Sequence, residues 1–207
     1  MVGASCVAPL HEPANLDRSK QELRRYVASQ AYDRDLETVV EQANRWIGQR
    51  VEVRKQGERL AVVFDVDETL LRNAEQIMAH DFGYDETEWE RWVVSAKAKP
   101  LEPVCQLLRT ARRLGVEIVV ITGRPEHQRE ATVENLQRAG CADYALLICK
   151  PEDETTVTTT AFKTAERKRL VADGWVIIAN VGDQRSDLDG GFAEREFKLP
   201  NPFYFTP

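Results

Sequence analysis

Short apolar runs alternate with segments of helical periodicity along most of the chain. The runs rich in β-branched and aromatic residues are LAVVF (60–64), VEIVVIT (116–122), YALLIC (144–149) and WVIIANVGD (175–183). Apolar runs of this length, without strict polar alternation, are typical of strands buried on both faces of a sheet. A weaker run, EFKL (196–199), predicts one more strand.

Helical segments precede the second, third and fourth of these runs. They cover residues 102–113, 126–139 and 160–172 and are followed by Gly115, Gly140 and Gly174. Strands that alternate with helices predict βαβ units and a parallel sheet covered on both faces. We therefore expect an α/β fold with a Rossmann-like, doubly wound parallel sheet. Its strands end at one common edge, where ligands bind in such folds.

Two further helical regions lie outside this alternation. Residues 16–31 and 33–48 predict a helical N-terminal lead-in, whose apolar stripe is a packing surface. The interval 72–100 fits no strand, and its segments NAEQIMAH and DETEWERWVVSA are helical in pattern. We expect this interval to form a small helical cap inserted after the first strand. The chain then consists of a flexible N-terminus, 1–15, and one domain, 16–207.

Composition narrows the classes of function. The 207 residues are 43% hydrophobic and 30% charged, which is ordinary for a globular domain. The net charge of −6 argues against a nucleic acid polymer as partner. No apolar stretch approaches the roughly 20 residues of a transmembrane span. The sequence does not determine the oligomeric state.

The four cysteines form no CxxC pair and have no histidine partners at zinc spacing. A disulfide among Cys105, Cys141 and Cys149 is possible, but the sequence cannot pair them. Cys6 lies in GASC, which looks like the end of a bacterial lipoprotein signal. This motif predicts lipidation of Cys6 and a periplasmic or outer-membrane location. The alternative is an ordinary flexible N-terminus and a cytoplasmic protein.

Carboxylates gather where the predicted strands end. FDVDETLL (64–71) places Asp65, Asp67 and Glu68 directly after an apolar run. Buried like charges are unfavourable unless a cation or hydrogen-bond donors compensate them. The other strand ends and the helix 160–172 add Thr122, Gly123, Arg124, Lys163, Asp183 and Asp187. Carboxylates, a hydroxyl and cations together can hold a hard metal ion and a phosphate.

The order of four motifs resembles that of the haloacid-dehalogenase-like (HAD) phosphohydrolases. The motifs are DVDET (65–69), ITGR (121–124), FKTAERKR (162–169) and GDQRSD (182–187). The chain is more closely similar to the class B/III-B acid phosphatase branch, which includes plant vegetative storage proteins and bacterial lipoprotein acid phosphatases. The segments YDRDLETVVEQA, WERW and FKLPNPFYF add to this resemblance, which covers the chain from about residue 20 to its end.

The resemblance implies roles for the two carboxylates of the first motif. Asp65 is expected to be the nucleophile that becomes an aspartyl-phosphate. Asp67 is expected to protonate the leaving oxygen and then to deprotonate the attacking water. Asp65, the backbone carbonyl of Asp67 and Asp183 are expected to hold Mg²⁺. Asp187 then anchors the metal through water or orients Lys163.

The resemblance also implies a phosphate-binding set. Its members are Thr122, Gly123, Arg124 and Lys163. Motif position favours Lys163 over Lys168 and Arg167 as the phosphate cation. Arg124 has two interpretations, a contact at the edge of the phosphate or a structural ion pair.

We therefore expect a Mg²⁺-dependent acid phosphatase acting on small-molecule phosphomonoesters, nucleoside monophosphates included. Trp89, Trp92 and Tyr204 are candidates for stacking on a substrate base, and the alternative is that they pack the cap on the core. A storage or surface-display protein with little turnover is the alternative function. A dehalogenase or phosphonatase fits less well because Asp67 is present, and a response-regulator receiver does not suit a cap-sized insertion.

Overall fold

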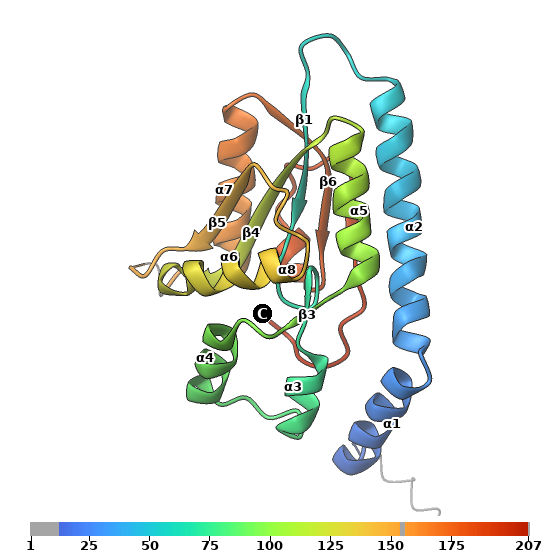
Figure 1. Cartoon of the computed structure of the whole chain (residues 1–207), viewed down its shortest axis with the longest axis vertical. Helices are drawn as coiled ribbons and strands as arrows, with labels where there is room; N and C mark the ends of the chain where they lie inside the picture. The colour runs from blue at the N-terminus through green and yellow to red at the C-terminus, as the bar shows by residue number, and fades with distance from the viewer. Residues whose placement is uncertain (1–12, 154–155, 207) are drawn as a thin grey trace, which may run out of the picture.

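The computed structural model describes residues 13–153 and 156–206 (Figure 1). Its main sheet has five parallel strands in the order β5-β4-β1-β6-β7. The strands are β1 (Arg59–Phe64), β4 (Glu117–Pro125), β5 (Leu146–Lys150), β6 (Trp175–Gly182) and β7 (Glu196–Lys198). All five predicted strands are confirmed, and β4 continues three residues beyond its predicted end at residue 122.

Alternate residues of the central strand β1 enter two different cores. Leu60, Val62 and Phe64 join the core that contains α2 (Ala31–Glu52), α5 (Glu102–Arg113) and α6 (Arg129–Arg138). Ala61 and Val63 join a smaller core against α7 (Thr159–Ala172). Successive side chains of a strand point to opposite faces, so both faces of this sheet are covered. Figure 1 shows α5 and α2 on one side and α7 on the other, as expected for a doubly wound sheet.

The helical lead-in consists of α1 (Leu16–Ala28) and α2. The two helices meet at Gln30, whose φ of 61° is left-handed, so the break falls two residues before its predicted place. α2 is also longer than predicted, because it begins at Ala31 and ends at Glu52, four residues beyond the predicted end at residue 48. It packs lengthwise against α5. Residues 1–12, with Cys6 and most of the predicted flexible N-terminus, lie outside the described residues.

The predicted cap is formed by α3 (Ala74–Ala79) and α4 (Glu86–Ser95). Both helices lie beyond the C-terminal ends of β1 and β6 (Figure 1). The expectation that residues 72–100 contain no strand is wrong at both ends of the interval. There, β2 (Leu71–Arg72) and β3 (Lys99–Pro100) form a two-residue antiparallel ladder that closes the base of the cap. Segments this short show no periodicity in the sequence.

The structure pairs two of the cysteines. Cys105 in α5 and Cys141, which follows α6, form a disulfide with a Cα–Cα distance of 5.4 Å. Cys149 is a buried free thiol. Among the described residues, no helix is both long enough and apolar enough to span a membrane.

Candidate active site

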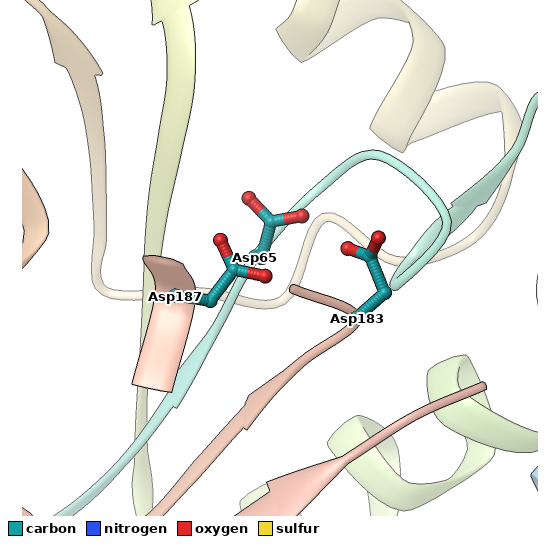
Figure 2. Close-up of side chains that lie close together, drawn as sticks. All are labelled: Asp65, Asp183 and Asp187. Carbon is teal, nitrogen blue, oxygen red and sulfur yellow. The ribbon is translucent and has the colours of Figure 1, made fainter. Parts of the chain in front are cut away.

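Three buried carboxylates meet at the C-terminal edge of the sheet (Figure 2). Asp65 follows β1 and Asp183 follows β6, which are neighbouring strands, while Asp187 lies in α8 (Arg185–Leu188). One oxygen from each carboxylate lies within 4.8 Å of the others. Gly182 permits this approach because a Cβ atom there would lie 2.5 Å from the Cβ of Asp187. The backbone N–H of Gln184 donates to Asp187 over 2.8 Å and fixes its orientation.

The electrostatics of this cluster favour a bound cation. Burial raises the pKa of Asp65 well above its ordinary value, and Asp187 and Asp183 add to this rise against the opposing effect of Lys163. Burial, followed by the charge of Asp187, raises the pKa of Asp183 to about 7. Buried carboxylates that repel one another are stabilised in the ionised form by a metal. Their all-oxygen donor set fits a hard divalent cation such as Mg²⁺.

Lys163 in α7 bridges two of these carboxylates. Its ammonium group donates to Asp65 and, over 2.7 Å, to Asp187. Although burial alone lowers the pKa of Lys163, Asp187 and Asp65 raise it above its ordinary value, so the side chain stays charged. The competing cation Arg167 instead donates to backbone carbonyls, including those of Asp187 and Gly191. Asp187 therefore contacts Lys163 directly, and its role in orienting the lysine stays a prediction.

Asp67 and Arg124 form a second charged pair beside the cluster. The Arg124 Nε and Nη2 atoms donate to the two Asp67 oxygens over 2.9 and 2.6 Å. Burial raises the pKa of Asp67, but the charge and hydrogen bonds of Arg124 outweigh it, so the net shift is downward. The guanidinium is itself buried and also donates to Thr132. Of the two interpretations of Arg124, the ion pair is the one present in this structure.

Thr122 and Gly123 lie in the C-terminal part of β4, where the pairing with β5 is interrupted between Ile121 and Pro125. The buried Thr122 hydroxyl accepts a 3.1 Å hydrogen bond from the backbone N–H of Arg124. Gly123 lines the cavity above the carboxylates together with Arg124. The structure therefore brings the predicted phosphate-binding segment to the same edge as Asp65 and Lys163.

Two residues that position Asp183 were missed in the sequence. Asn201 and Gln184 donate side-chain hydrogen bonds of 2.6 and 2.9 Å to the same Asp183 oxygen, Oδ2. Thr69, in the first motif, donates to the other oxygen over 3.2 Å. LPNP signals a turn, but no local pattern shows that Asn201 reaches a carboxylate 18 residues away.

A cavity of about 980 Å³ lies between the cap and the strand ends. Asp65, Asp67 and Asp183 lie at its base, and Trp89 of the cap and Tyr204 of the C-terminal segment line its walls. The expectation that Trp92 also stacks on a substrate is not supported by its position. Trp92 is half-buried, and its indole N–H donates to Asn73 over 2.7 Å.

A parallel sheet, a cap after the first strand, carboxylates at the strand ends and a lysine from α7 beside them together define a hydrolase of the haloacid-dehalogenase type. The family model described as HAD superfamily, subfamily IIIB (acid phosphatase), matches residues 11–207. The chain belongs to this family. The resemblance and the enzyme class, a phosphoric monoester hydrolase, are thereby confirmed.

Curated plant proteins are similar over most of the chain. Acid phosphatase 1 of Solanum lycopersicum is 35% identical over 187 residues, which cover 88% of this chain and 72% of that protein. The stem 28 kDa glycoprotein of Glycine max is 32% identical over 188 residues, with the same two coverages of 88% and 72%. Vegetative storage protein 1 of Arabidopsis thaliana is 35% identical over 150 residues, covering 70% of this chain and 55% of that protein.

The fold also matches solved structures. The class C acid phosphatase from Bacillus anthracis aligns with a TM-score of 0.69 at 21% identity, covering 90% of this chain and 86% of that chain. The same enzyme with tungstate bound aligns with a TM-score of 0.70 at 22% identity. At this level of identity the match confirms the α/β fold class.

Proposed function

We propose that this protein is a Mg²⁺-dependent acid phosphatase that hydrolyses small phosphomonoesters through a phosphorylated Asp65. The observation that carries the proposal is the buried cluster of Asp65, Asp183 and Asp187 with Lys163 at the sheet edge. Phosphoryl transfer depends mainly on positioning and charge neutralisation, which this cluster provides. Family membership supports the same reaction class.

The reaction proceeds in two displacements. An Asp65 oxygen attacks phosphorus, the bond from phosphorus to the ester oxygen breaks, and Asp67 gives its proton to the departing alcohol. Water then attacks the phosphorus of the aspartyl-phosphate, Asp67 takes a proton from it, and inorganic phosphate leaves as Asp65 is regenerated. A carboxylate nucleophile divides one difficult hydrolysis into two easier steps.

The metal is proposed to be held by Asp65, Asp183 and the backbone carbonyl of Asp67. When bound, it supplies positive charge that neutralises the carboxylates and the phosphoryl oxygens. Asp187 fixes Lys163, and Lys163 binds a phosphoryl oxygen together with the Thr122 hydroxyl. The side chains of this set that hold the metal or the phosphate are buried at one edge of the sheet: Asp65, Asp183, Asp187, Lys163 and Thr122.

The wall of the cavity favours an aromatic leaving group. Trp89 and Tyr204 reach it from the cap and from the C-terminal segment, and Phe82 and Tyr84 line it as well. Aromatic rings can stack on any nucleobase, whichever base it is. Nucleoside monophosphates are therefore among the proposed substrates.

Hydrolysis of p-nitrophenyl phosphate tests the proposal. Protein treated exhaustively with a chelator should be inactive, and added Mg²⁺ should restore turnover. Asp65→Asn should abolish turnover while the thermal unfolding midpoint shows an intact fold, because an amide is a poor nucleophile. Full activity after exhaustive chelation, or near-normal rates in Asp65→Asn, contradicts the proposal.

A storage protein with little turnover is the second candidate function. It is favoured by the similarity to two Arabidopsis thaliana proteins named vegetative storage protein. The intact pair of Asp65 and Asp67 opposes it, since storage alone requires neither carboxylate. Wild-type protein that fails to hydrolyse any of a panel of phosphate esters with Mg²⁺ present supports storage.

The cellular location is a proposal that rests on two features. Lipidation of Cys6 rests on the GASC motif alone, and the plant relatives give it no support. The disulfide between Cys105 and Cys141 favours an oxidising compartment, since such bonds are rare in reducing ones. Mass spectrometry of Cys6 in the protein isolated from its source tests the first feature.

A further inference from the structure

Asn73 connects the proposed general acid to the cap. Its Nδ2 atom donates to Asp67 Oδ1 over 2.8 Å and to Glu68 Oε2 over 3.0 Å. Its Oδ1 atom accepts the indole N–H of Trp92 in α4 over 2.7 Å. Asn73 is fully buried between these partners. A hydrogen-bonded chain therefore runs from the cap helix to the carboxyl group of Asp67.

The partners of Asn73 allow only one orientation of its side-chain amide. An indole N–H can only donate, so it must face the amide oxygen. An ionised carboxylate can only accept, so Asp67 in that form faces the amide nitrogen. A rotated amide would place its oxygen against Asp67 and Glu68 and its nitrogen against the indole N–H. Trp92 is the donor that holds the amide in the orientation needed by Asp67.

We propose that Asn73 and Trp92 are positioning residues that orient the Asp67 carboxyl group toward the leaving oxygen. This inference rests on the proposed phosphatase activity. The cap helix α4 also carries Trp89 and Glu90 at the cavity wall. A leaving group that contacts α4 therefore affects, through Trp92 and Asn73, the position of the Asp67 carboxyl group. Trp92 thus acts on catalysis without touching the substrate.

Other contacts hold α4 on the core, so the Trp92 hydrogen bond is not needed to attach the cap. Glu90 accepts from Gln128, and Arg138 donates to the backbone carbonyl of Ala96 over 3.1 Å. Val93 is buried on the same helix. Loss of the indole N–H alone should leave the cap in place and loosen the amide of Asn73, which then keeps only its contacts with Asp67 and Glu68.

The test is Trp92→Phe, which removes the N–H and keeps most of the ring. An alkoxide needs a proton to leave, whereas nitrophenolate leaves with little help. General acid catalysis contributes about 10²–10⁴-fold to the rate. Partial misplacement of Asp67 should therefore lower kcat/KM for glycerol phosphate about tenfold or more. The value for p-nitrophenyl phosphate should fall less than about threefold. The ratio kcat/KM is the readout because it reports steps up to departure of the alcohol.

Trp46→Phe is the matched control. Trp46 in α2 donates an indole hydrogen bond of the same length, 2.7 Å, to the backbone carbonyl of Ile178, away from the cavity. This variant loses one equivalent hydrogen bond and should keep the wild-type ratio between the two esters. Asp67→Asn gives the ratio expected when the proton donor is lost altogether.

Asn73→Ala should change the ester ratio in the same direction as Trp92→Phe. Because the two residues act through one contact, the double variant should change the ratio no further than Asn73→Ala alone. Equal loss on both esters in Trp92→Phe, or an unchanged ratio, overturns the inference. Should Trp92→Phe not fold, Asn73→Ser carries the same expectation. Absence of hydrolysis by the wild-type protein is a different outcome and counts against the proposed function instead.

Discussion

Arg124 holds both carboxylate oxygens of Asp67 with hydrogen bonds of 2.9 and 2.6 Å. A guanidinium can only donate, so it stabilises Asp67 as an anion. A protonated Asp67 donates from one oxygen, and that oxygen must first give up its contact with Arg124. Binding of an ester can release this contact if the phosphate attracts the guanidinium of Arg124. Arg124 then forms an ion pair with Asp67 in the free protein and contacts the phosphate in the complex, so both interpretations of its motif apply.

The rate of ester hydrolysis should depend on pH as a bell with its maximum at mildly acid to neutral pH. The active form combines an ionised Asp65 with a protonated Asp67, and it is most populated between their pKa values. Burial raises the pKa of Asp65, and Arg124 lowers the pKa of Asp67 against the effect of burial, so both shifts oppose the active form. Metal charge beside Asp65 and release of Asp67 from Arg124 reverse these two shifts. Below the maximum Asp65 is then protonated and cannot attack, and above it Asp67 has lost the proton that the leaving group needs.

The control for this profile is Asp67→Asn. Its residual rate with p-nitrophenyl phosphate should rise with pH to a plateau, because only the ionisation of Asp65 still matters. A wild-type rate that climbs steadily into strongly alkaline solution contradicts the assignment of Asp67.

Asn201→Ala should weaken metal binding. The side-chain amide of Asn201 fixes Asp183 over 2.6 Å, and loss of such an outer partner typically lowers metal affinity or activity about 10–100-fold. The Mg²⁺ concentration for half-maximal activity should rise by that factor. Asn44→Ala, exposed on α2, is the matched control and should leave it unchanged. An unchanged Mg²⁺ requirement in Asn201→Ala would falsify the role of this residue.

Trp89→Ala and Tyr204→Ala should each raise KM for a nucleoside monophosphate more than for glycerol phosphate. Stacking of a base on an aromatic ring contributes about 1–3 kcal/mol. This corresponds to a rise in KM of about 5- to 150-fold, at one decade per 1.4 kcal/mol. Equal losses on both substrates, with a lowered unfolding midpoint, would show that the rings only pack the cap on the core.

Reduction of the disulfide should lower the free energy of unfolding. The bond between Cys105 and Cys141 closes a sequence separation of 36 residues, and the chain-entropy estimate for such a loop is about 3–4 kcal/mol. Urea unfolding with and without reductant measures the difference. The loss of stability caused by reductant should persist in Cys149→Ala, because the Cys149 thiol is free in the wild-type protein. It should vanish when Cys105 and Cys141 are both replaced by alanine. A reductant effect of equal size in that double variant contradicts the pairing.

The sheet and its reactive edge could be predicted from the order of residues alone. Apolar runs alternate with helices, and right-handed crossovers bring parallel strand ends together. That placed Asp65, Asp183 and Asp187 at one edge before any contact was known, because position along a strand depends on local pattern. The helical cap segment could be predicted in the same way, because its residues follow helical periodicity.

Which side chains meet at this edge depends on how separate elements pack against one another. The sequence left Arg124 open between phosphate and ion pair, and the partner it takes lies 57 residues away. It proposed Trp92 for stacking, but the direction of the indole in α4 turns its N–H to Asn73. It could not pair the cysteines, because α5 and the end of α6 come together only when the core packs. Such contacts depend on side-chain direction across separate elements, which periodicity does not encode.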